Sequence, residues 1–175
     1  MLIQLKSLFN IAYVNILELS VAASIFMLSG AYGFEYIGGL FPCDLCWPQR
    51  YAHMAVIVFG SFALYMRRSK NVKWIRFKIM TAASYMISTG YSGYHAGVEQ
   101  KWWEGPDSCT LQTDPGQMTS DQFFQQLQNV TFIRCDEIPW DLFGVSMAGY
   151  NFIISLILFI MLSFSVREDV KNARA

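Results

Sequence analysis

Four long apolar stretches constrain the fold of this chain more than any other feature. They cover about residues 11–34, 46–66, 74–94 and 143–166. An α-helix rises about 1.5 Å per residue, so roughly 20 apolar residues cross the ~30 Å hydrocarbon layer of a bilayer. The hydrophobic share of 54% exceeds the ~45–50% of soluble domains. The sequence therefore predicts an all-α integral membrane protein, with residues 1–175 forming a single membrane domain built as a four-transmembrane-helix bundle.

The first stretch is expected to be a membrane helix rather than a cleaved signal peptide. Its apolar run continues from Ile11 to Phe34, and no small-residue cleavage pattern closes a short apolar core. Glu18 lies inside this helix, where we expect it to make a structural hydrogen bond near the cytoplasmic third. The third stretch has a short apolar core, so Arg76 and Lys78 are expected to snorkel towards an interface.

Charged residues are sorted between the loops, and this sorting predicts the orientation in the membrane. The segment 67–78 holds six bases and no acid, whereas the segment 99–141 holds eight acids and two bases. Bases also follow the last stretch, at Arg167, Lys171 and Arg174. Since cytoplasmic loops are rich in Lys and Arg, both termini and the loop at 67–78 are predicted to be cytoplasmic. Acids and bases balance at 13 each, which favours no nucleic-acid partner.

The long loop 99–142 is then predicted to lie on the opposite, oxidising side. Within it, residues 120–127 are expected to form a short amphipathic helix on the membrane surface, with Ser120 as N-cap. The same side would carry all four cysteines, Cys43, Cys46, Cys109 and Cys135. An even number on that side is compatible with two disulfides, and four cysteines allow three connectivities.

Cys43 and Cys46 form a C-x-x-C pair just before the second apolar stretch. A helix that starts at Cys46 would tolerate Pro48 in its first turn, and its N-terminus would favour a thiolate. Arg50 follows one turn later on the same face and adds a permanent positive charge. Because close thiols can cycle between dithiol and disulfide, the local pattern favours a redox pair.

Other roles for a C-x-x-C pair fit this sequence less well. A structural zinc site is disfavoured because Cys109 and Cys135 form no second C-x-x-C, and no metal is expected. Covalent haem attachment needs a histidine after the second cysteine, where Trp47 stands. A purely structural disulfide remains open, although a short loop at the membrane edge suits one poorly.

His95 follows the third apolar stretch and should reach the same membrane edge, because the second and third helices run antiparallel. Thiol exchange conserves the number of disulfides, so continuous turnover needs an external two-electron acceptor. Quinone is the obvious lipid-soluble one. Arg50 and His95 would flank the anchored pair, where a cation and a hydrogen-bond donor stabilise negative charge on quinone oxygens.

Together these motifs resemble the bacterial disulfide bond formation protein B (DsbB) family, which reoxidises periplasmic thiol oxidoreductases. The resemblance covers nearly the whole chain, and it is carried by four stretches: residues 42–46 with Gln49-Arg50, residues 94–99, the pair Cys109 and Cys135, and residues 140–144. Two departures are Pro48, where many relatives carry another residue, and Gln49, where some carry Glu.

The resemblance implies a role for each motif residue. Cys43 and Cys46 would be the quinone-proximal pair, with Cys46 in contact with ubiquinone or menaquinone, and Arg50 and His95 would form the quinone site. Cys109 and Cys135 would face a periplasmic thioredoxin-fold (DsbA-like) thiol oxidase, with Cys109 taking the mixed disulfide. The location implied is the bacterial inner membrane.

Two alternative functions stay open at this point. A vitamin K epoxide reductase-like protein also couples cysteine pairs to quinone, although its C-x-x-C lies in a late helix. A non-catalytic four-helix membrane adaptor would use disulfides only to brace its external loop.

Overall fold

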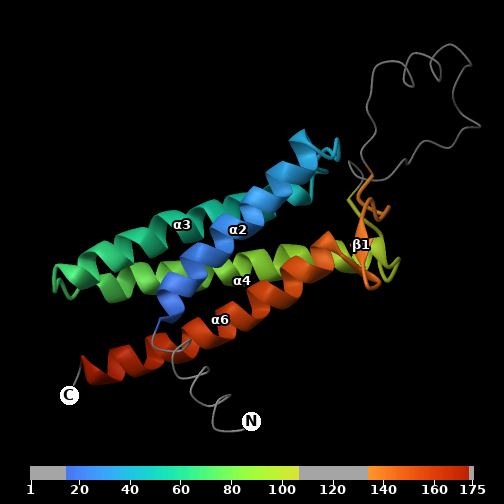
Figure 1. Cartoon of the computed structure of the whole chain (residues 1–175). Helices are drawn as coiled ribbons and strands as arrows, with labels where there is room; N and C mark the ends of the chain where they lie inside the picture. Colours follow the sequence, from blue (N-terminus) through green and yellow to red (C-terminus); the bar gives the residue numbers. More distant parts are fainter. Residues whose placement is uncertain (1–14, 107–133, 174–175) are drawn as a thin grey trace, which may run out of the picture.

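Four long helices run side by side in the computed structural model, which describes residues 15–106 and 134–173 (Figure 1). They are α2 (Ile16–Tyr36), α3 (Cys46–Arg68), α4 (Trp74–Glu99) and α6 (Met147–Asn172). A two-stranded antiparallel hairpin, β1 (Asp141–Leu142) and β2 (Val145–Ser146), precedes α6. The predicted helical bundle is thus present, with one small hairpin added to it.

The predicted helix bounds hold for α2 and α3 to within a few residues over the described part of the chain. Helix α4 is longer than expected and continues past Tyr94 to Glu99, so His95 lies within the helix. Residues 11–14, Cys109 and the amphipathic helix expected at 120–127 lie outside the described residues.

The predicted start of the last helix at Phe143 was wrong. Phe143 and Gly144 have positive φ angles of 52° and 77° and form the two-residue turn of the hairpin. Positive φ at both turn positions matches the right-handed twist of paired strands. Helix α6 begins only after Ser146, whose hydroxyl accepts a hydrogen bond from the Gly149 amide as an N-cap.

Polar side chains line the inside of the bundle along α4. The stripe recurs every three or four residues, the spacing of one helix face, and its members are all buried: Lys78, Thr81, Tyr85, Ser88, Ser92, His95 and Glu99. Buried partners face it from other helices, among them Ser24 on α2, His53 on α3 and Ser155 on α6. This stripe lowers the hydropathy of α4, although its polar groups are buried inside the bundle.

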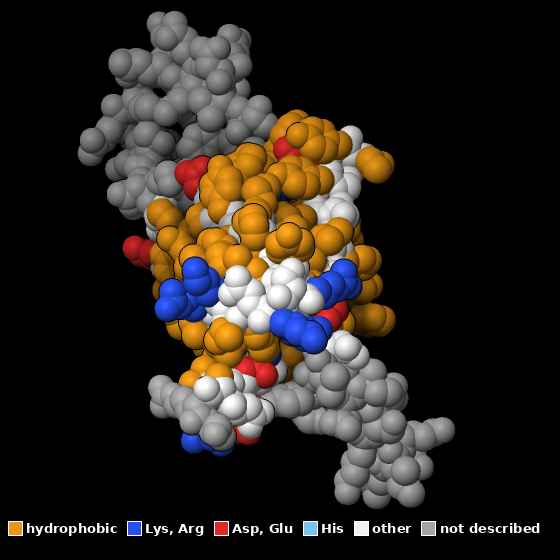
Figure 2. Space-filling view, turned by 90° about the vertical axis from the view of Figure 1, so that its left-hand side faces the viewer, with side chains coloured by type: hydrophobic (Ala, Val, Ile, Leu, Met, Phe, Trp, Pro, Cys, Tyr) orange, Lys and Arg blue, Asp and Glu red, His pale blue; other side chains and the backbone are white. Residues whose placement is uncertain are grey.

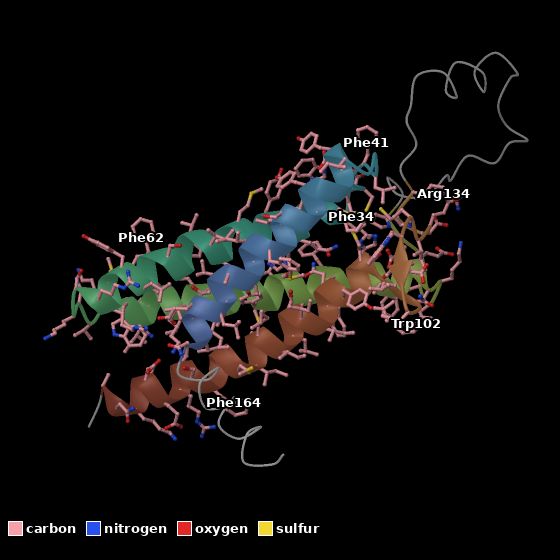
Figure 3. All side chains as sticks on the ribbon, viewed as in Figure 1. Phe34, Phe41, Phe62, Trp102, Arg134 and Phe164 are labelled. Carbon is pink, nitrogen blue, oxygen red and sulfur yellow. The ribbon has the colours of Figure 1, made fainter. Side chains whose placement is uncertain are left out.

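Large hydrophobic side chains cover the outside of the same helices. Phe62 on α3 and Phe164 on α6 are 51% and 58% exposed, and both stand away from the bundle in Figure 3. A polar interior with an apolar exterior suits a lipid environment. Of the described helices, α2 and α6 are long and apolar enough throughout to cross a membrane.

The two ends of the bundle differ in charge. The end where α3 passes into α4 carries Lys and Arg side chains, which Figure 2 shows face on. There Glu18 pairs with Arg67, and Lys78 pairs with Ser165 and Asp169. Glu18 therefore has the structural partner that the sequence predicted, whereas Lys78 turns into the bundle, 3% exposed, rather than outward to an interface.

Candidate active site

The C-x-x-C pair lies at the opposite end of the bundle, where α3 begins. Cys46 is the first residue of α3, and its amide donates to the carbonyl of Cys43 at 3.0 Å. Pro48 falls in the first turn, where a missing N–H needs no helical partner. Both cysteines are free, and their sulfurs lie 3.1 Å apart. The sequence therefore placed this pair correctly at a helix N-terminus.

His95 reaches the same pair from α4, as the antiparallel packing predicted. Its Nε2 lies 3.6 Å from Cys43 Sγ and 3.8 Å from Glu99 Oε1, and the ring is 5% exposed. The hydrogen bond with Cys46, followed by burial, raises the pKa of the Cys43 thiol above its ordinary value.

Cys135 lies near the C-terminal end of the long loop 99–142 and packs into the same site. It is fully buried and disulfide-bonded. Cys43, Leu45, Val98 and Cys135 form one buried cluster, and Cys46 packs against it. Both cysteines of the C-x-x-C pair and one cysteine of the loop pair therefore lie in a single apolar contact region. Cys109 lies outside the described residues, so its pairing with Cys135 stays a prediction.

Arg50 lies on the α2 side of the site. Its guanidinium pairs with Glu35, donates to the Ala31 carbonyl at 3.3 Å, and lies over the Tyr32 and Trp47 rings at 4.7 and 5.3 Å. Sequence reasoning missed Glu35 and Tyr32. The available signal was the acid Glu35 near the end of a long, mostly apolar helix, because a carboxylate buried there needs a partner.

Glu99 and Ser146 connect the histidine to the hairpin. The Ser146 hydroxyl donates to the Glu99 carboxylate, which is 6% exposed and one helical turn beyond His95. The same hydroxyl caps α6. Ser146 was not identified from the sequence, because its role depends on the hairpin that precedes α6.

An ion-pair cluster holds the residues around Cys135 against the end of α4. Arg134 donates to both carboxylate oxygens of Asp136 at 2.9 and 2.7 Å, and Lys101 reaches one of them at 3.2 Å. The hydrogen bond from Arg134 is the main reason that the pKa of Asp136 falls to about 2. Arg134 and Trp102 mark this end of the molecule in Figure 3.

A metal ion would find three ligand atoms here, on Cys43, Cys46 and His95, all within 4.8 Å of one another. Two thiolates bound tetrahedrally to zinc at about 2.3 Å would stand roughly 3.8 Å apart. The sulfurs at 3.1 Å are closer than that. The geometry favours a thiol pair poised for exchange, and the absence of a metal stays a prediction.

Comparisons with known proteins point to one family. The family model "Disulfide bond formation protein DsbB" matches residues 15–165. Disulfide bond formation protein B of Acidovorax sp. is 26% identical over 161 residues, covering 85% of this chain and 84% of that protein. The protein of the same name from Paracidovorax citrulli is 27% identical over 173 residues, covering 91% and 90%.

An uncharacterized protein of Rickettsia prowazekii is 30% identical over 145 residues, with 81% of each chain covered. No solved structure matches the chain significantly. The family match covers α2, α3, α4, most of α6 and the C-x-x-C pair. The chain therefore belongs to the DsbB family of disulfide bond formation proteins, which are inner-membrane disulfide oxidoreductases.

Proposed function

We propose that this protein reoxidises a periplasmic thioredoxin-fold (DsbA-like) dithiol oxidase and passes the electrons through two cysteine pairs to membrane quinone. The observation that carries the proposal is the buried contact region shared by Cys43, Cys46 and Cys135. Exchange between two cysteine pairs needs sulfur atoms that can meet without crossing the bundle. Membership of the DsbB family supports the same reaction class.

The first exchange involves the loop cysteines. The partner dithiol becomes a disulfide, and the Cys109–Cys135 disulfide becomes a dithiol, so two electrons and two protons enter the loop pair. Cys109 is the proposed site of the mixed disulfide. The loop dithiol then reduces a Cys43–Cys46 disulfide and is itself reoxidised. The second exchange leaves the electrons on the anchored pair.

The residues around Arg50 fit a quinone by their chemistry. Arg50 supplies a fixed positive charge, and its bonds to Glu35 and Ala31 use two of its five N–H groups. Tyr32 and Trp47 supply aromatic faces beside it. Bound here, ubiquinone or menaquinone would supply the acceptor for two electrons and two protons. Arg50 would hold a quinone oxygen, and His95 would donate a hydrogen bond on the cysteine side.

The proposed membrane arrangement places all four long helices across the inner membrane. The basic end with the loop at 67–78 and both chain termini would be cytoplasmic, because Lys and Arg favour that side. The cysteine end and the loop 99–142 would be periplasmic. In this orientation the loop pair meets soluble thiols, and the anchored pair stays at the edge of the lipid.

The direct test is anaerobic quinone reduction by the purified protein with a reduced thioredoxin-fold partner. The wild-type protein should produce quinol in proportion to partner disulfide. Cys46→Ser should abolish quinol formation while membrane insertion stays normal. Unchanged turnover in this variant would refute the assignment of Cys46.

Thiol trapping in membranes separates the relay from a non-catalytic adaptor. In a relay, the trapped fraction of Cys43 and Cys46 changes when quinone is withdrawn and restored. In an adaptor whose disulfides only brace the loop, both cysteines keep one redox state under all conditions. An inert pair would therefore overturn the proposal.

A further inference from the structure

A hydrogen-bonded row of buried polar side chains runs from His95 into the middle of the bundle. Apart from His95, none of these side chains has a part in the proposed function. The row links Gln49 and His53 of α3, Asn151 of α6 and Ser24 of α2. These side chains and the histidine are each 8% exposed or less. Every member has a hydrogen-bond partner, so the direction of each bond can be followed from residue to residue.

The backbone carbonyl of Leu45 fixes which side chain donates and which accepts in each of these hydrogen bonds. Gln49 Nε2 lies 2.8 Å from this oxygen, which can only accept. The Gln49 amide nitrogen therefore points towards Leu45, and its second hydrogen is left for His95 Nδ1 at 3.1 Å. Because the amide group donates there, His95 Nδ1 must accept. A neutral His95 ring then carries its proton on Nε2.

The same reasoning extends through Asn151 to the second histidine. Gln49 Oε1 accepts from Asn151 Nδ2 at 2.6 Å, so Asn151 Oδ1 points the other way. That oxygen accepts from Ser155 at 2.9 Å and lies 2.9 Å from His53 Nε2. His53 Nε2 must therefore donate. A neutral His53 then accepts at Nδ1 from Ser24 Oγ, which lies at 3.0 Å. The Tyr85 hydroxyl also lies 2.9 Å from Ser24 Oγ and donates its own hydrogen to the Ser20 carbonyl, so it competes with His53 for the single Ser24 hydrogen.

We propose that Gln49 and Asn151 are positioning residues that hold both histidines as the neutral Nε2–H tautomer. His95 then presents an N–H to the sulfur of Cys43, 3.6 Å away. Glu99 Oε1 lies 3.8 Å from the same nitrogen, too far for a direct hydrogen bond. A hydrogen-bond donor held against the sulfurs favours negative charge on them during exchange. The tautomer itself does not depend on the proposed electron acceptor.

The amide of Gln49 also opposes a charged imidazole. A protonated His95 would carry an N–H on Nδ1, and this would face the N–H of Gln49. Reversing the Gln49 amide would relieve that clash, but it would set the Gln49 oxygen against the Leu45 carbonyl. The reversed row, with both histidines protonated on Nδ1, is therefore the competing arrangement.

Nitrogen NMR of the full-length protein in detergent distinguishes the two directions. The chain has two histidines, so a sample labelled with 15N-histidine gives two ring systems to assign. At neutral pH, long-range nitrogen–proton spectra should show both rings protonated on Nε2 and unprotonated on Nδ1. Protonation of His95 on Nδ1, whether in the reversed tautomer or as imidazolium, would overturn the proposal.

Variants test which side chains set the tautomer. Gln49→Glu removes the donor and offers an acceptor, so His95 Nδ1 should become protonated at the same pH. Asn151→Leu should alter the His53 signals and leave His95 unprotonated on Nδ1, because Leu45 still orients Gln49. A His95 spectrum that is unchanged in Gln49→Glu would contradict a positioning role.

Ser84→Ala is the matched control. Ser84 is a buried serine of α4 whose hydroxyl donates to the Met80 carbonyl of its own helix. Both histidine spectra should be unchanged in this variant. A shift of either tautomer in Ser84→Ala as large as in Gln49→Glu would also overturn the proposal, because it would mean that any buried substitution disturbs the rings.

Discussion

At the scale of single residues, the ion pair of Arg50 and Glu35 determines the net charge and the position of the guanidinium at the proposed quinone site. Both side chains are largely buried, at 7% and 12% exposure. A buried charge that loses its partner is left uncompensated, and breaking a fully buried pair costs about 3–5 kcal/mol. Glu35 therefore holds the guanidinium in place as well as balancing its charge.

This coupling predicts the result of a double-mutant cycle. Arg50→Ala and Glu35→Ala should each raise the apparent KM for quinone about 10- to 150-fold, since a charge-assisted hydrogen bond contributes about 1.5–3 kcal/mol. The double variant should be little worse than either single variant, because both remove the same interaction. Steady-state quinone reduction gives the apparent KM of all three variants. Effects that multiply in the double variant would show that the two side chains act separately.

Glu18→Ala is the matched control for this cycle. Glu18 also pairs with an arginine, Arg67, but at the basic end of the bundle. Its loss should leave the apparent KM for quinone unchanged. A comparable rise in KM would mean that the effect of Glu35→Ala comes from general loosening of the helices.

At the scale of secondary-structure elements, Ser146 joins the hairpin, α6 and α4. It ends β2, caps α6 and donates to Glu99. Loss of an N-cap costs about 1 kcal/mol, and the Glu99 carboxylate would also lose its donor. One hydroxyl therefore fixes where α6 starts and how the end of α4 packs against it.

Ser146→Ala should lower the Tm of the detergent-solubilised protein by about 3–8 °C, given ~2–4 °C per kcal/mol for a chain of this size. Ser146→Thr keeps the hydroxyl and should restore most of the loss. Ser69→Ala is the control, because that exposed serine donates to its own helix at the other end. An equal Tm in Ser146→Ala and the wild type would contradict the capping role.

The elements also show what the sequence can predict. Helix positions follow from long apolar stretches, and the start of α3 follows from Pro48 and the cysteines before it. The start of α6 was missed because Phe143 looks like the first apolar residue of a helix, whereas it adopts a turn with positive φ. The roles of Gln49 and Asn151 could not be predicted, because these residues are 102 positions apart and only the packing brings them together.

At the scale of the whole molecule, the bundle is polar inside and apolar outside. This distribution explains why α3 and α4 look less apolar than α2 and α6 and still suit a membrane. Buried serines bond to carbonyls of their own helix or to neighbouring helices, so few polar groups need water. The charged residues lie towards the two ends, and several of them form ion pairs, such as Lys78 with Asp169.

If α3 and α4 both cross the membrane, the two ends of the bundle must face different compartments. Single cysteines introduced into a cysteine-free background test this. Asn71→Cys lies exposed between α3 and α4, and Lys101→Cys lies exposed just after α4. In cells with a permeabilised outer membrane, an impermeant maleimide should label Lys101→Cys at once and Asn71→Cys only after lysis. Immediate labelling of both positions would place the cysteine end and the basic end on one side, and the proposed four-span orientation would fail.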